Sequence, residues 1–148
     1  MNDIVKMKEK LYEEAKNYIA TLTVEQKLEL AKDPNTSVFD LEVLGEDPNA
    51  EIRIEVAKHP KMPYVEGGEL EKRLANDQDP RVKIEIAKRS DLFPSTIDQL
   101  TNDQNPEVKL ALIENPGIFR ENLEQLTNDQ NPEVRAAARK RLNEILRH

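Results

Sequence analysis

Hydrophobic positions recur along most of this chain with a period of about 26 residues. A leucine and, eight residues later, a β-branched residue return together four times, at spacings of 30, 26 and 26 residues. The ten residues from Gln99 to Val108 recur unchanged from Gln125 to Val134. A fixed period of this length predicts tandem repeats over residues 24–131, whose hydrophobic faces are buried against neighbouring repeats. The leucines are Leu44, Leu74, Leu100 and Leu126, and the β-branched residues are Ile52, Val82, Val108 and Val134.

Polar residues hold fixed places between each leucine and its β-branched partner and directly after that partner. An Asp follows the leucine by three residues, an Asn or Asp follows that Asp by two, and a base follows it by six. The middle residue of these three is expected to cap a helix, because its side-chain oxygen can accept a hydrogen bond from a backbone N–H of the first turn. Proline comes next in three of the four copies, and proline suits the first position of a helix. The capping residues are Asn49, Asp79, Asn105 and Asn131.

The segment Arg81–Lys88 challenges a helical interpretation, because its apolar and charged residues alternate as they do in a strand. The equivalent segments of the sister copies do not alternate and are rich in residues that favour helices. Units of one array share a structure, and a helix sandwiched between neighbours carries apolar residues on two sides. The sequence therefore predicts a helix here and an all-α chain.

Each repeat is predicted to hold a second, shorter helix. The first helices are expected to end at a polar residue followed by proline, because a residue before proline is pushed out of the helical region. Short segments that lead up to the leucine follow, for example residues 38–44, 95–101 and 121–127. Their length suits either α- or 3-10 helices, and the sequence leaves that choice open.

Other patterns precede, interrupt and follow the repeats. Residues 3–20 form one predicted amphipathic helix, a cap expected to cover the first repeat. Residues 23–26 match a capping box, and proline with two adjacent glycines within residues 61–69 predicts a loop. Residues 132–147 predict a longer helix that caps the other end. The apolar stripe of the first helix consists of Ile4, Met7, Leu11, Ala15, Tyr18 and Ile19.

A helix that opens N/D-P-E-V-R/K, an N-P stop and a short leucine-bearing segment together resemble the leucine-rich repeat variant family. The pattern is also similar to HEAT-like repeats, whose units carry a comparable D…VR element. The resemblance covers about residues 24–142. It implies an α-solenoid, a right-handed superhelix of two-helix repeats in which α- and 3-10 helices alternate. Some members of the variant family bind an iron–sulfur cluster through cysteines, and this chain has no cysteine.

The composition predicts a thin, aliphatic core. Of the 148 residues, 34% are charged and 4% are aromatic, and the length predicts a single domain over residues 1–148. The longest apolar run, Leu110–Ile113, is far too short to cross a bilayer, and the first residues lack the apolar stretch of an export signal. The absence of cysteine excludes disulfides and thiolate chemistry. We therefore expect a soluble, cytoplasmic protein without a membrane partner.

Residues suited to metal or covalent chemistry are scarce. The only histidines are His59 and His148. The spacing of Asp103, Asn105 and Glu107 resembles a calcium loop faintly, but the glycine that such a loop needs is missing. The three serines lie outside any nucleophile-elbow motif, and the four glycines provide no phosphate-binding loop. We expect no metal, no cofactor and no enzymatic activity.

A column of basic residues is the most regular polar feature. Its members Arg53, Lys83, Lys109 and Arg135 each follow the Asp of their repeat by six residues. The structural interpretation joins these bases to Asp47, Asp77, Asp103 and Asp129 in a ladder of hydrogen bonds and ion pairs that ties repeat to repeat. The alternative is a row of cations that follows the phosphates of a nucleic acid. A net charge of −7 disfavours that alternative.

Negative charge is concentrated in one part of the chain. Residues 33–71 hold ten acidic and three basic residues, and the remaining acids and bases are equal in number. The same segment holds the irregular loop with its apolar side chains. An acidic patch beside adaptable apolar residues favours docking of a basic or amphipathic protein segment. The candidate binding residues are Glu42, Glu46, Glu51, Glu55, Met62, Tyr64 and Val65.

The first functional hypothesis is a non-enzymatic scaffold for protein–protein interaction. It would bind a basic or amphipathic protein or peptide, and a surface held rigid by repeats spends little ordering entropy on binding. The second hypothesis is a nucleic-acid binder that uses the basic column, and an enzyme of unfamiliar type ranks last. The sequence leaves the identity of the partner and the oligomeric state open.

Overall fold

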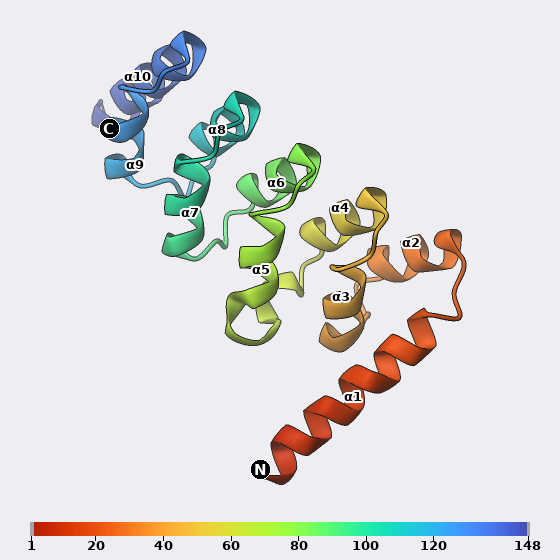
Figure 1. The fold of residues 1–148 in the computed structure, drawn as a ribbon. Coiled ribbons are helices and arrows are strands. Elements are labelled where there is room, and N and C mark those ends of the chain that lie inside the picture. The colour runs from red at the N-terminus through yellow and green to blue at the C-terminus, as the bar shows by residue number, and fades with distance from the viewer. Residues whose placement is uncertain (1, 148) are drawn as a thin grey trace. The chain divides into compact units, whose positions relative to one another are not determined.

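The computed structural model describes residues 2–147, apart from the side chain of Glu66, and every regular element in that part of the chain is a helix (Figure 1). The predicted all-α class is therefore confirmed. The first helices of the repeats are α2 (Val24–Lys32), α4 (Ala50–Lys58), α6 (Pro80–Ala87), α8 (Pro106–Ile113) and α10 (Pro132–Leu146). The second helices are α3 (Val38–Leu44), α5 (Glu69–Leu74), α7 (Pro94–Thr101) and α9 (Arg120–Leu126).

The short second helices are α-helices, which answers the question that their length left open. The helix over Arg81–Lys88 is also confirmed, because α6 spans Pro80–Ala87. Only two 3-10 turns occur in the described part of the chain, η1 (Met62–Tyr64) and η2 (Glu66–Gly68). Regular alternation of α- and 3-10 helices, which the family resemblance implies, is therefore not observed.

Helix starts follow the predicted chemistry. Asn49, Asp79, Asn105 and Asn131 each accept a hydrogen bond from the backbone N–H two residues later, at 2.8 to 2.9 Å. The capping box before α2 is complete, with Thr23 and Gln26 bonded to each other's backbone. Each such cap stabilises its helix by about 1 kcal/mol.

The chain divides into two compact units, Met1–Leu74 and Ala75–His148. In the first unit, α1 (Asp3–Ile19) packs against α3, and α2 packs against α4. In the second unit, α8 packs between α6 and α10, and the shorter α7 and α9 cover them from one side (Figure 1). The expectation of a single domain over residues 1–148 stays a prediction.

The recurring hydrophobic positions form the core of each unit. The four leucines and the four β-branched residues that recur are all at most 1% exposed. Leu41 and Val56 complete the core of the first unit, and Leu112 and Leu123 that of the second, all fully buried. Burial of one such side chain contributes roughly 1.5–3 kcal/mol, so this thin core depends on each position.

The insertion that lengthens the second repeat is the irregular segment 61–69. It folds into η1 and η2, and Gly67 and Gly68 have φ angles of 69° and 71°. Residues with a Cβ rarely adopt this left-handed conformation, so glycine is needed at both places. Met62 and Val65 turn inward and are buried, whereas Tyr64 is 76% exposed.

The N-terminal helix is present as predicted, but most of its apolar stripe is not covered. Only Ala15 and Ile19 are buried in α1. Ile4 and Met7 are 66% and 63% exposed, although they were expected to lie on the first repeat. The expectation is wrong for this half of α1, because the helix runs on past the end of α3 (Figure 1).

Candidate protein-binding surface

Ion pairs between residues twenty positions apart connect three of the first helices, α2, α6 and α8, to the loop before the next first helix. Lys83 Nζ on α6 donates to Asp103 Oδ2 at 2.8 Å, and Lys109 Nζ on α8 donates to Asp129 Oδ1 at 2.5 Å. In the first unit, Lys27 Nζ on α2 donates to Asp47 Oδ2 at 2.9 Å. Ion pairs between aspartate and lysine therefore do recur, but these lysines pair with the Asp that follows them along the chain and not with the Asp six residues before them, as was expected.

Lys27 is a further member of the basic column that was not predicted from the sequence. It lies 26 residues before Arg53, at the repeat period, so the signal was present. The leucine and proline landmarks are absent before α2, and the column was therefore counted from the second repeat onward.

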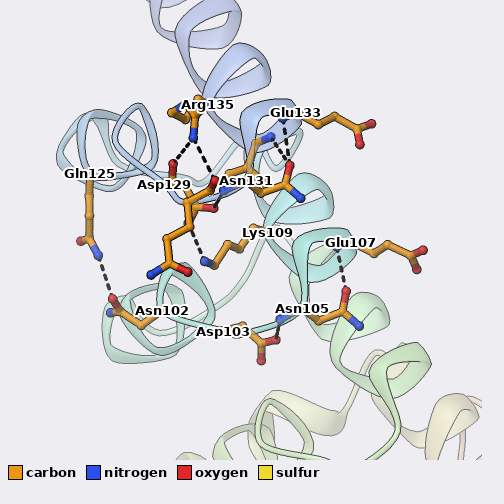
Figure 2. Close-up of polar contacts among 12 residues, drawn as sticks. Asn102, Asp103, Asn105, Glu107, Lys109, Gln125, Asp129, Asn131, Glu133 and Arg135 are labelled. Carbon is orange, nitrogen blue, oxygen red and sulfur yellow. Dashed lines mark hydrogen bonds and ion pairs between the residues drawn. The ribbon is translucent and has the colours of Figure 1, made fainter.

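The two arginines of the column make a different contact. Arg53 Nη1 donates to the carbonyl oxygens of Asp47 and Pro48, at 2.7 and 3.1 Å. Arg135 Nη1 does the same with Asp129 and Gln130, at 2.8 and 2.9 Å (Figure 2). These contacts join residues five and six apart within one repeat and reach the backbone of the loop, whereas the ladder was expected to tie repeat to repeat.

Each Asp of the ladder also shapes the loop that carries it. Asp103 Oδ1 accepts from the backbone N–H of Asn105 at 2.8 Å, and Asn105 then caps α8 (Figure 2). Asp47, Asp77 and Asp129 make the same turn two residues ahead. One carboxylate therefore joins the preceding lysine to the start of the next helix.

The electrostatics of Asp129 reflect this position. Burial raises the pKa of its carboxyl group, but the hydrogen bonds from Lys109 and the Asn131 backbone, with the charges of Lys109 and Arg135, outweigh that effect. The pKa of Asp129 therefore lies below its usual value. The charged form is the one that the folded protein stabilises.

A second row of polar contacts joins the ends of the first helices. His59 Nε2 donates to the carbonyl oxygen of Asp33 at 2.7 Å, while His59 Nδ1 accepts from the Lys61 backbone. In the second unit, Asn115 Nδ2 donates to the carbonyl oxygens of Ala87 and Arg89, at 2.5 and 2.7 Å. His59 is buried and serves the fold, and His148 lies outside the described residues.

Side chains on the second helices add further links in the second unit. Asn122 Nδ2 on α9 donates to Asp98 Oδ1 at 2.9 Å, and Gln125 Nε2 donates to Asn102 Oδ1 at 2.7 Å (Figure 2). The sequence of a single repeat does not indicate these contacts, because the two partners of each hydrogen bond lie in different repeats. The contacts hold α9 at a defined position against α7.

The basic column therefore offers few free cations. The lysine side chains of the two pairs in the second unit are 18% and 15% exposed, and their charges face carboxylates. A nucleic-acid phosphate would have to displace those carboxylates, which disfavours the row of cations as a phosphate track.

The four predicted glutamates lie on α3, on α4 and in the turn between them. Glu42 is on α3, Glu46 is in the turn that follows it, and Glu51 and Glu55 are on α4. Burial raises the pKa of Tyr12 on α1, and the charges of Glu46 and Glu42 raise it further. Tyr12 therefore lies in a negative electrostatic potential. Arg73, which pairs with Glu46, lowers the pKa of Tyr12 and so reduces this effect.

Two of the predicted apolar contact residues do not lie on the surface. Met62 and Val65 are 1% and 4% exposed, so their side chains belong to the core of the first unit. The loop was expected to present them because it lacks helical periodicity, but its 3-10 turns fold them inward. Tyr64 alone remains an accessible apolar candidate from that loop.

The described residues provide no group of three or more His, Cys, Asp or Glu side chains placed to hold a metal ion. Within that part of the chain, no helix is both long and apolar enough to span a membrane. Comparison of the chain with protein-family models, curated proteins and solved structures finds no significant match. The fold and the candidate surface therefore rest on the residues themselves.

Proposed function

We propose that this protein is a non-enzymatic scaffold that binds a basic or amphipathic segment of another protein. The observation that carries the proposal is the concentration of acid in residues 33–71, ten acidic residues against three basic ones. Glu42 and Glu46 place part of that charge beside Tyr12, on a surface built from α1 and α3. Aromatic and acidic groups side by side complement a peptide that carries both apolar and basic residues.

We further propose an α-solenoid in the cytoplasm, of the kind that the resemblance to the leucine-rich repeat variant and HEAT-like families implies. The support is that the same lysine–aspartate pair, Asx turn and N-cap occur once in the first unit and again at the repeat period in the second unit. Equivalent contacts at a fixed period are what nearest-neighbour stacking of repeats requires. The right-handed superhelix is part of the same proposal.

Rigidity is the proposed mechanism. Buried ion pairs and capped helices hold the side chains of each surface in place before a partner arrives. Binding then costs little conformational entropy, and the acidic charge steers a basic segment during its approach. No observation favours the nucleic-acid alternative, because the basic column is engaged with carboxylates and carbonyl oxygens.

The experiment compares two pairs of neutralised glutamates. Glu42→Gln with Glu46→Gln, the α3 variant, removes charge from α3 and the turn after it, and Glu51→Gln with Glu55→Gln is the matched control on α4. Fluorescence anisotropy with a labelled basic amphipathic peptide is expected to show binding that weakens with salt. The α3 variant is expected to lose about tenfold in affinity, and the α4 variant is expected to bind like the wild type.

Two results would contradict the proposal. One is binding of the basic peptide that neither variant changes. The other is tight, steeply salt-dependent binding of random duplex DNA with no binding of the peptide, which would make the protein a nucleic-acid binder. If the peptide binds as expected, affinity capture from cell extract with the wild type and the α3 variant would identify the natural partner.

A further inference from the structure

The exposed side of α1 carries a seam typical of a helix that pairs with another helix. Ile4, Met7, Leu11 and Tyr18 follow one another at spacings of three, four and seven residues. This is the a and d pattern of a coiled coil, with Glu14 at the remaining d position. All four apolar side chains are exposed, from 37% at Leu11 to 66% at Ile4.

The second half of this seam borders a groove between α1 and α3. Leu11, Ala15, Tyr18 and Phe39 line a hollow of about 430 Å³, together with Glu14 and Asp40. Burial raises the pKa of the Asp40 carboxyl group, whereas a basic neighbour would lower it.

A second hollow of about 320 Å³ continues from Tyr18 towards α2. Its apolar residues are Leu22 and Leu30, and its acids are Glu29 and Asp33. None of the described residues that line either hollow is Lys or Arg. The occupant that fits this surface is therefore an amphipathic helix with basic residues beside its apolar face.

The first half of α1 is itself such a helix. Residues 3–10 expose Ile4 and Met7, and the same stretch holds three lysines, Lys6, Lys8 and Lys10, against two acids, Asp3 and Glu9. The chain thus carries both a groove that is apolar and acidic and a segment that is apolar and basic. Both lie on one helix, at opposite ends of it.

We propose that two copies of this chain dimerise by antiparallel pairing of their α1 helices, so that residues 3–10 of each copy occupy the α1–α3 groove of the other. A two-fold axis near Leu11 sets this leucine against its counterpart, and brings Ile4 of one copy near Tyr18 of the second. Lys8 and Lys10 then approach the second copy's Glu14 and Asp40. The exposed ion pair of Lys10 with Glu14 of its own helix, at 4.0 Å, is exchanged for a contact between the copies. The contact is self-complementary, as an isologous interface must be.

The interface is small, which predicts a weak dimer. A helix of 17 residues is about 25 Å long, and pairing along α1 with its groove falls at the lower end of specific interfaces. The dimer is therefore expected to dissociate on dilution. The variants that test the dimer leave Glu42 and Glu46 of the proposed scaffold surface in place, so the two proposals fail or succeed separately.

Sedimentation equilibrium of the full chain over a range of concentrations tests the proposal with two charge-reversal variants. The first is Lys8→Glu with Lys10→Glu, and the second is Glu14→Lys with Asp40→Lys. Each variant alone is expected to be monomeric, because its two interfaces bring like charges together. An equimolar mixture is expected to restore the dimer, because both interfaces then join opposite charges.

Controls keep the outcome decisive. Circular dichroism establishes that each variant is folded, and Lys140→Glu on the exposed side of α10 is expected to dimerise like the wild type. Leu11→Glu is expected to abolish the dimer without reversing a rim charge. A wild type that is monomeric at every concentration overturns the proposal, as does a dimer that survives both charge reversals. Binding of the monomer to anionic vesicles through Lys8 and Lys10, without dimerisation, also overturns it.

Discussion

The ammonium group of Lys109 lies 2.5 Å from a carboxylate oxygen of Asp129, twenty residues further along the chain. Their side chains are 15% and 10% exposed. The pair is therefore shielded from solvent, unlike the exposed pair of Arg120 and Glu124 on α9. It connects α8 to the loop that starts α10, and the same contact recurs at Lys83 with Asp103.

Removal of the Asp129 carboxylate is expected to be costly. Asp129→Ala leaves the Lys109 ammonium without its partner and also breaks the turn to Asn131, so we expect a loss of about 2–4 kcal/mol in the free energy of unfolding. Urea denaturation measures this loss. Glu124→Gln, in the exposed pair, is the control and is expected to change stability by less than about 0.5 kcal/mol. Equal effects of the two substitutions would show that the ladder adds no stability.

The dependence of stability on pH should reveal the same carboxylate. The pKa of Asp129 is lower in the folded protein than its usual value of 3.8, so the unfolded chain binds the proton more readily. Its stabilising contribution is complete above the usual value and is lost as the pH falls through the lower folded pKa. The acid limb is the part of the stability curve in which the free energy of unfolding falls as the pH falls. We expect Asp129→Asn to flatten this limb, as measured by urea denaturation at a series of pH values.

Asp91 provides the comparison for that experiment. The hydrogen bond from Arg89 lowers its pKa as well, but its side chain is 47% exposed. Asp91→Asn is therefore expected to change the acid limb less than Asp129→Asn does. A limb that neither substitution alters would mean that other carboxyl groups control unfolding in acid.

The recurring leucines offer a test of the shared core. Leu100 and Leu126 are at most 1% exposed, and each lies at the end of a second helix. Leu100→Ala and Leu126→Ala are each expected to cost about 2–5 kcal/mol, because truncation leaves a cavity among packed neighbours. Urea unfolding measures both, and Leu146→Ala, at an exposed position of α10, is the control. A loss below about 1 kcal/mol at either leucine would contradict its place in the core.

The core could be predicted because it depends on local chemistry that repeats. Leucine, capping residue and proline recur at fixed intervals, and each acts within a few residues of its own position. The partner of Lys83 could not be predicted in this way, because Asp77 and Asp103 are both compatible with the spacing and only packing chooses between them. The inward turn of Met62 and the exposure of Ile4 were missed for a related reason. An apolar side chain in an irregular loop or on an amphipathic helix does not reveal which surface covers it.

The last prediction concerns the second row of polar contacts, at the ends of the first helices. Asn115 is buried, and it donates to the carbonyl oxygens of Ala87 and Arg89 while it accepts from the Gly117 backbone. Asn115→Ala leaves these buried groups without their hydrogen bonds, at a cost of about 1–3 kcal/mol. Asn115→Asp is expected to cost more, because a carboxylate would face two carbonyl oxygens.

Asn115→His is the informative comparison. His59 fills the equivalent position in the first unit, where its ring donates to the carbonyl of Asp33 and accepts from the Lys61 backbone. A neutral imidazole supplies one donor and one acceptor, so it can replace one of the two hydrogen bonds that Asn115 donates and the one that it accepts. The histidine variant is therefore expected to be more stable than the alanine variant. Urea denaturation of the three variants under the same conditions gives the order. If alanine were the least disruptive, these hydrogen bonds would not hold the helix ends together.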